Sequence, residues 1–216
     1  MGVILVSSIL ERHYELIGRK AVDALRKNRF KAEFVKSSDE AIAAAMSLIT
    51  KEDSIGLGGS MTVEGLGLEK LLSAQGNLLY NHQGLPPEEA YLVRRKQLTA
   101  DVFLCSSNAV TLTGELINVD GAGNRVAAMT FGPKRVVVIV GANKIVKDEE
   151  DGRRRIKMTA APMNTDRLKR KTPCVSIGYC VECDSPERIC SLTSILHKAP
   201  MGSDFHVIVV GEALGY

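Results

Sequence analysis

The chain has 216 residues, of which 45% are hydrophobic and 25% charged, and its formal net charge is +3 at pH 7. This balance excludes disordered, collagen-like and membrane-spanning classes, and the length fits a single domain over residues 1–216. So small a positive charge, with only 5% aromatic residues, argues against nucleic-acid binding.

We expect no secretory signal at the start of the chain, because the apolar run over residues 1–6 is short and Glu11 and Arg12 follow soon after it. We therefore expect a cytoplasmic protein that does not attach to a membrane. Two basic runs, residues 153–155 and 167–171, are interpreted as solvated helix faces.

The first half of the chain alternates helices and strands. Apolar positions three or four residues apart predict a helix over residues 9–30, followed by a strand at 32–36 and a helix that starts near Ser38. Residues 53–58 predict a short strand and residues 62–72 a helix. A strand at 77–80, a helix that begins at Pro86 and Pro87 and runs to about Leu98, and a buried strand at 100–105 complete this half.

The second half changes pattern at residues 114–129. Here the turn Asp120-Gly121-Ala122-Gly123-Asn124 separates two strand-like runs, which predicts a β-hairpin near 115–129. The β-branched run at 135–140 predicts a central strand covered on both faces. Residues 148–171 predict helices, and 205–210 predict a last strand. The fold class is therefore α/β, with a mixed, mostly parallel sheet, flanking helices and a hairpin excursion.

The first candidate binding element is the glycine-rich turn over residues 56–62. Its backbone N–H groups, together with the hydroxyls of Ser60 and Thr62, could bind a phosphate or carboxylate at the start of a helix. The turn is neither a Walker motif nor a complete GxGxxG fingerprint. A plain tight connection is an equal alternative. The candidate ligand-binding residues are Gly58, Gly59, Ser60 and Thr62.

A second polar cluster follows the strand at 100–105. It places hydroxyl, amide and carboxylate groups beyond the carboxyl end of that strand, where open α/β sheets bind ligands. Glu115 is the one carboxylate there that could act as a general base. The alternative is a loop whose side chains bond their own backbone. The candidate binding residues are Ser106, Ser107, Asn108 and Thr111.

Asn143 and Lys144 follow the central strand at 135–140. We expect Asn143 to contribute to binding and Lys144 to neutralise an anion near the glycine turn. Asp120, Asn124 and Arg125 are interpreted as turn formers rather than ligands.

These segments, taken in order, resemble the lactate-utilisation (LUD) domain family, formerly catalogued as a domain of unknown function. The resemblance rests on residues 58–62, 106–111, 113–115, 120–129 and 141–146 and covers nearly the whole chain. It implies a fold related to the ribose-phosphate isomerase, glucosamine-phosphate deaminase and CoA-transferase superfamily. It also implies a role in the bacterial conversion of L-lactate to pyruvate with iron–sulfur partner proteins.

Four of the five cysteines lie close together in residues 172–192, at Cys174, Cys180, Cys183 and Cys190. In a cytosolic protein such clustering favours metal over disulfides, so the four thiolates could hold zinc or an iron–sulfur cluster. The spacing matches neither a zinc ribbon nor a ferredoxin, and buried free thiols are the alternative. Cys105 is interpreted as a core residue.

Three functions follow from these observations. The first is a lactate-utilisation protein that binds a small anionic metabolite and acts with iron–sulfur partners. The second is a free-standing isomerase-like or transferase-like enzyme on a phosphorylated or CoA-linked substrate, with Glu115 as base or nucleophile and Lys144 at the oxyanion. The third is a metal-binding or redox-sensing module built on the four cysteines. The sequence is also compatible with a homo-oligomer.

Overall fold

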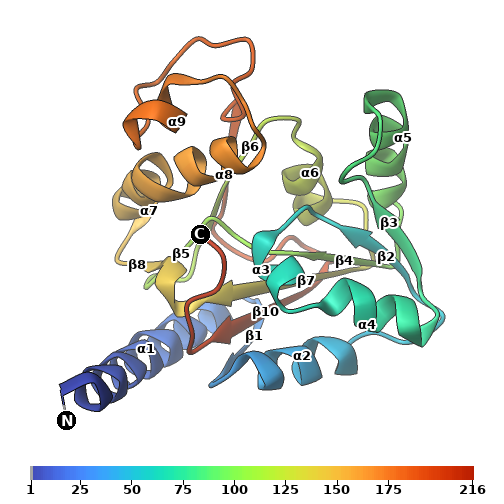
Figure 1. Cartoon of the computed structure of the whole chain (residues 1–216). Coiled ribbons are helices and arrows are strands. Elements are labelled where there is room, and N and C mark those ends of the chain that lie inside the picture. Colours follow the sequence, from blue (N-terminus) through green and yellow to red (C-terminus); the bar gives the residue numbers. More distant parts are fainter. Residues whose placement is uncertain (1) are drawn as a thin grey trace.

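The computed structural model describes the backbone of residues 2–216 and the side chains of residues 8–216. Its centre is a six-stranded sheet in which all neighbouring strands are parallel (Figure 1). The strand order is β1 (Lys31–Val35), β10 (Asp204–Val210), β7 (Arg135–Gly141), β4 (Val102–Cys105), β2 (Ser54–Leu57) and β3 (Leu78–Asn81).

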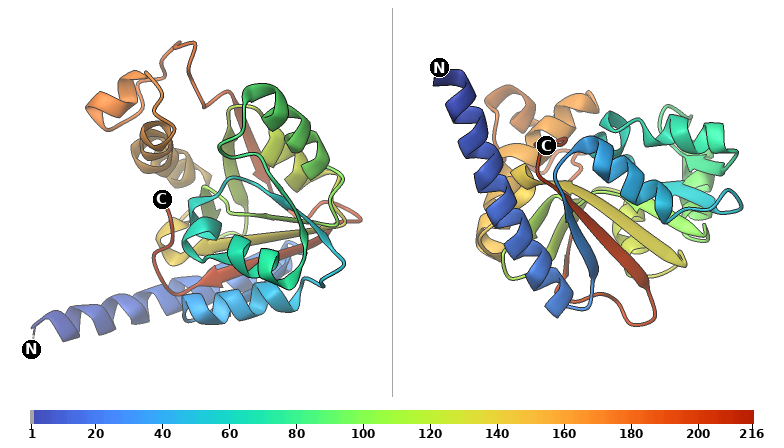
Figure 2. Two further views of the ribbon diagram at one scale, coloured as in Figure 1. Left: turned by 45° about the vertical axis from the view of Figure 1, so that its right-hand side comes forward. Right: turned by 90° about the horizontal axis from the view of Figure 1, so that it is seen from below.

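Helices cover both faces of this sheet. One face packs against α2 (Ser38–Ser47), α3 (Met61–Gly65) and α4 (Leu68–Gln75), and the other against α1 (Gly2–Lys27) and α6 (Asn124–Thr130). Strand β7 contributes to both cores, because Val137 and Ile139 point to the first face and Val136 and Val138 to the second. Helix α5 (Pro87–Gln97) lies along β2 and β3. The right panel of Figure 2 shows α1 beside the β1 edge.

A second, four-stranded sheet has the order β8 (Ile145–Val146), β5 (Ala109–Thr111), β6 (Leu116–Asp120) and β9 (Leu192–Leu196). It is mixed, since β5 pairs parallel with β8 and β6 pairs antiparallel with both neighbours. Helix α7 (Glu149–Arg155) packs on it and continues through the π-helical turn η2 (Ile156–Ala160) into α8 (Ala161–Arg167) and, after a loop, α9 (Pro173–Ile177). The 3-10 turn η1 (Ala142–Lys144) joins the two sheets.

The α/β class, the parallel sheet and the central position of the strand at 135–140 are confirmed. The hairpin near residues 115–129 is wrong. Residues 124–130 form α6, because Gly123 (φ +80°) turns the chain and the carboxylate of Asp120 accepts a 3.1 Å hydrogen bond from the N–H of Val126. Alanine and methionine in this run also favour a helix. Strand β6 pairs instead with β5 and with β9, which the sequence did not reveal.

Among the described helices, none combines the length and the apolar composition needed to cross a membrane.

Candidate functional site

A cleft of about 870 Å³ opens where the chain reverses its direction across the main sheet. From β2 the chain passes outward to β3, then returns to β4 on the other side of β2 and continues to β7. Open α/β sheets bind ligands at such a switch point, beyond the carboxyl ends of the strands. Residues 58–61, after β2, and 106–108, after β4, both line the cleft.

The glycine-rich turn is shaped by packing as well as by the cleft. A Cβ atom on Gly58 would lie 2.9 Å from the Cβ of Cys105, and Gly59 has a left-handed backbone (φ +70°). The hydroxyl of Ser60 accepts a 3.3 Å hydrogen bond from the N–H of Val63 and so caps α3. The tight-connection reading therefore explains these glycines, and ligand binding by the turn stays a prediction.

Lys144 brings the loops after three strands together. Its Nζ donates hydrogen bonds to Oγ1 of Thr62 at 2.8 Å and to Oγ of Ser106 at 3.0 Å, and the side chain is 3% exposed while still lining the cleft. Burial, together with the charges of Arg155 and Arg125, lowers the pKa of Lys144 to about 7. Near neutral pH this lysine can therefore exist as either the ammonium or the free amine.

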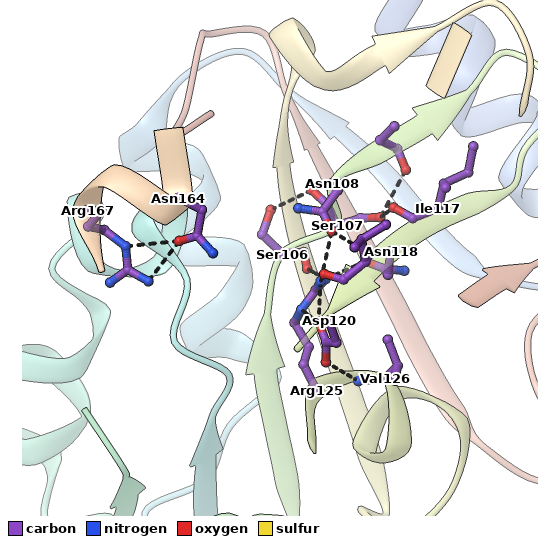
Figure 3. Close-up of polar contacts among 12 residues, drawn as sticks. Ser106, Ser107, Asn108, Ile117, Asn118, Asp120, Arg125, Val126, Asn164 and Arg167 are labelled. Carbon is purple, nitrogen blue, oxygen red and sulfur yellow. Dashed lines mark hydrogen bonds and ion pairs between the residues drawn. The ribbon is translucent and has the colours of Figure 1, made fainter. Parts of the chain in front are cut away.

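Arg125 and Asp120 form a buried ion pair at the floor of the cleft (Figure 3). Asp120 Oδ1 accepts hydrogen bonds from Nε of Arg125 at 3.0 Å and from Nη2 at 2.7 Å. The guanidinium also donates to the backbone oxygen of Ser106 at 3.0 Å, to Oδ1 of Asn108 at 2.8 Å and to Oδ1 of Asn118. The pair was expected to form a turn, but it holds the loop after β4 in place.

Arg155 ties the same loop to the segment after β7. Its Nη1 donates to the backbone oxygen of Asn108 at 2.6 Å and its Nε to that of Asn143 at 3.1 Å. Arg153 and Arg154, its neighbours, pair with acidic residues on the exposed face of α7, as expected. The basic run at 153–155 is therefore a solvated helix face except for its last residue.

The charge balance of the cleft is positive. Among the described residues, three carboxylate side chains line it, and Asp120 is already paired with Arg125. Nε of Arg94 is buried without a hydrogen-bond partner among the described residues. Arg167 donates two hydrogen bonds to Oδ1 of Asn164, at 3.1 and 3.0 Å (Figure 3). This lining favours an anionic ligand. The six cationic residues are Arg94, Arg125, Lys144, Arg167, Arg170 and Arg188.

His82 faces the cleft next to Gly59. The pKa of His82 is lowered to about 4, mainly by burial and to a smaller extent by the charges of Arg94 and Arg167. The imidazole is therefore neutral at pH 7. The amide nitrogen of the buried Gln97 lies 2.9 Å from Nδ1. The same amide nitrogen donates to the backbone oxygens of Leu57 at 2.8 Å and Tyr80 at 2.9 Å. Position 82 therefore offers the cleft a neutral imidazole.

The last residues of the described chain cover the Lys144 region. Oγ1 of Thr62 donates to the backbone oxygen of Leu214 at 3.2 Å, and Asn143 bonds the backbone of Leu214 at 3.1 Å and of Gly215 at 3.2 Å. Tyr216 lines the cleft and its hydroxyl donates to Oδ1 of Asn164 at 2.9 Å. Asn143 thus positions this segment and is not itself among the lining residues.

Four predicted residues do not line the cleft: Thr62, which contacts Lys144, Asn143, which contacts Leu214, and two residues that lie apart, Glu115 and Thr111. Glu115 accepts hydrogen bonds from the hydroxyls of Thr111 and Thr113 in the turn between β5 and β6. That turn packs against the end of α1, and Asn28, the residue after this helix, donates to the backbone oxygens of Thr113 and Gly114 at 2.9 Å. Neither Glu115 nor Thr111 lines the cleft, so their catalytic and binding roles remain predictions without support from the geometry.

The four clustered cysteines occupy the loop around α9. All are free thiols; Cys174 is buried and the others are half-buried. The pKa of Cys190 is raised, first by burial and then by Cys180, with smaller effects of Cys174 and Cys183, so these thiols lie in one neighbourhood. Within the described residues, no three histidine, cysteine or carboxylate side chains are arranged to hold a metal ion. The zinc or iron–sulfur prediction therefore remains untested.

Thiol labelling should separate these cysteines from Cys105. Full burial raises the pKa of Cys105 to about 12, which lowers its thiolate fraction at pH 8 on the order of a thousandfold. We expect a chromogenic disulfide reagent to modify Cys180 and Cys183 rapidly and Cys105 only after denaturation, as judged by peptide mapping. The variant Cys105→Ala should keep the fast phase. Equally rapid labelling of Cys105 in the native protein would contradict its burial.

Three comparisons with known proteins bear on this geometry. A family model described as the LUD domain matches residues 18–210. The fold is similar to a crystal structure of a DUF162 family protein from Deinococcus radiodurans, with a TM-score of 0.54 and 16% sequence identity over 91% of this chain and 98% of the other. Among curated proteins, none matches.

Proposed function

The chain belongs to the LUD domain family, and on that premise we propose that it binds a small anionic metabolite in the cleft and supports the oxidation of L-lactate to pyruvate. In this proposal it acts in the bacterial cytoplasm with iron–sulfur proteins that carry the electrons. The five free cysteines fit a reducing compartment, where disulfides are rare.

The observation that carries the proposal is the cationic cleft around Lys144. Lys144 places its amine beside the hydroxyls of Thr62 and Ser106, and no described carboxylate pairs with it. Arg94 and Arg167 stand on another wall of the same cleft. A carboxylate that enters would gain charge-assisted hydrogen bonds from these groups.

Calorimetric titration tests this directly. We expect L-lactate and pyruvate to bind, and the variant Arg94→Met to weaken both by about tenfold, because it removes one charge-assisted contact worth about 1.5 kcal/mol. Arg153→Met, which changes an exposed cation outside the cleft, is the matched control and should leave both affinities unchanged.

Absence of binding by both acids to the folded protein would rule the proposal out. Binding of a phosphorylated sugar or an acyl-CoA with neither acid bound would instead favour the isomerase-like or transferase-like enzyme.

A further inference from the structure

Lys144 is a buried cationic residue that forms no ion pair with any described residue. Arg125, another buried cation of the cleft, is paired with Asp120 and donates four further hydrogen bonds to backbone and amide oxygens. Lys144, by contrast, contacts two neutral hydroxyls, and no described carboxylate side chain forms an ion pair with it. A lysine in this setting is more stable as the free amine than an exposed lysine is.

The hydrogen bonds around Nζ leave its lone pair unused. Thr62 directs its own hydroxyl hydrogen to the backbone oxygen of Leu214 at 3.2 Å, and Ser106 directs its own to that of Ser107 at 3.4 Å. Both hydroxyl oxygens therefore accept from Nζ. A neutral amine has two hydrogens and one lone pair, so the two bonds use both hydrogens. No third partner lies among the described side chains.

The surroundings suit an electrophile that arrives through the cleft. The loops at 58–61 and 106–108 lead to the amine, which lines the same cavity. A Cβ atom placed on Gly215 would lie 2.7 Å from Oγ1 of Thr62 and 3.4 Å from Nζ of Lys144, so the backbone of Gly215 lies close to the amine. Lys144 is 3% exposed.

From this geometry we infer that Lys144 is a nucleophilic amine that forms an imine with the carbonyl carbon of a 2-oxo acid bound in the cleft. The inference rests on the proposed function, because it takes the anionic ligand to be an oxo acid. The lone pair of Nζ attacks the carbonyl carbon, and the carbonyl oxygen leaves as water with the two amine hydrogens. No electron is transferred, and a protonated imine takes up one proton from solvent.

The lowered pKa of Lys144, about 7, means that close to half of the molecules carry the reactive amine at neutral pH. Exposed lysines such as Lys147 pair with carboxylates at the surface and are 80% exposed. A lysine with the ordinary pKa near 10.4 is unprotonated in fewer than about one molecule in a thousand at pH 7. Trapping at pH 7 should therefore select Lys144.

Reductive trapping is the test. The protein is incubated with pyruvate at pH 7 and treated with cyanoborohydride, and the products are analysed by intact mass and peptide mapping. We expect one reduced adduct per chain, on Lys144, and none with L-lactate, which has no carbonyl carbon to attack. The variants Lys144→Arg and Lys144→Met should lose the adduct, whereas Lys147→Arg should keep it.

Two results overturn the inference: pyruvate binding by calorimetry without any trapped adduct, and labelling spread over surface lysines that persists in Lys144→Met. The first leaves the proposed function intact, because binding is retained. A protein that binds no pyruvate and yields no adduct fails the proposed function as well, so the two failures are distinguishable. Lys144→Met keeps the test interpretable should the larger arginine not be accommodated.

Discussion

Replacing Arg125 with methionine is expected to destabilise the protein by about 3–5 kcal/mol. The side chain is 10% exposed and donates to Asp120, Asn108 and Asn118. Without it, a carboxylate that is 8% exposed loses its counter-ion, and several buried oxygens lose their donors. Removing one partner of a buried pair costs far more than the pair contributes, because the remaining charge is neither solvated nor compensated.

Urea unfolding at pH 7 measures this loss. The matched control is Arg153→Met, since Arg153 also pairs with a carboxylate but its side chain is 49% exposed, and such pairs contribute about 0–1 kcal/mol. A loss below about 1 kcal/mol for Arg125→Met would show that the ion pair does not hold the loop after β4. We also expect weaker metabolite binding in the variant, because residues 106–108 line the cleft.

Replacing Lys144 with methionine is expected to stabilise the protein at pH 7, by about 1–3 kcal/mol. The pKa of Lys144 falls from 10.5 to about 7 on folding, mainly through burial. At pH 7 Lys144 is therefore protonated in nearly all unfolded molecules but in only about half of the folded ones. Folding must release or bury this proton, which lowers the stability of the wild-type protein. Loss of the two hydrogen bonds to Thr62 and Ser106 offsets part of this gain.

The same pKa shift sets the pH dependence. Between pH 7 and about 10, the unfolded state binds more protons at Lys144 than the folded state, so this group makes the wild-type protein more stable as the pH rises, by up to about 1.4 kcal/mol per unit. The advantage of Lys144→Met should therefore shrink from pH 7 to pH 9. Subtracting variant from wild type cancels the titration of the cysteines.

Denaturation curves at several pH values, with Lys147→Met as an exposed control, measure this difference. A stability difference between wild type and Lys144→Met that does not change between pH 7 and pH 9 would mean that Lys144 titrates normally. In that case the lowered pKa of Lys144 would no longer support imine formation by this residue.

The stability cost of Lys144 bears on its role. A methionine of similar length would fill the same buried space without desolvating a charge, and yet an amine stands there with two hydroxyls arranged around it. Buried groups that lower stability in this way are common at functional sites, where their chemistry is needed.

The sequence located several elements well because their signals are local. The β-branched run of β7 and the proline start of α5 depend on residues close together in the chain. The turn at residues 120–124 misled for the same reason. Asp-Gly and Gly-Asn pairs form a tight turn in either case, and they do not say whether a strand or a helix follows. A capping carboxylate and the burial of Val126 and Met129 decided for α6.

The binding residues also fall into two groups, those indicated by local sequence patterns and those that only tertiary contacts bring to the cleft. The sequence by itself determined that polar residues follow β2, β4 and β7 at their carboxyl ends, because strand ends can be read from local patterns and parallel strands end at one edge of a sheet. It thereby pointed to Ser106 and Lys144, which the structure joins by a 3.0 Å hydrogen bond.

Only the tertiary structure decided the rest of the site. The antiparallel pairing of β5 with β6 separated Glu115 from the cleft. The fold also brought three residues to the cleft: His82 from the loop after β3, Arg94 from α5 and Arg167 from α8. It also turned Asp120 and Arg125 into a buried pair. These outcomes depend on contacts between residues far apart in the chain and on the desolvation that packing imposes, and neither is written in the spacing of neighbouring residues.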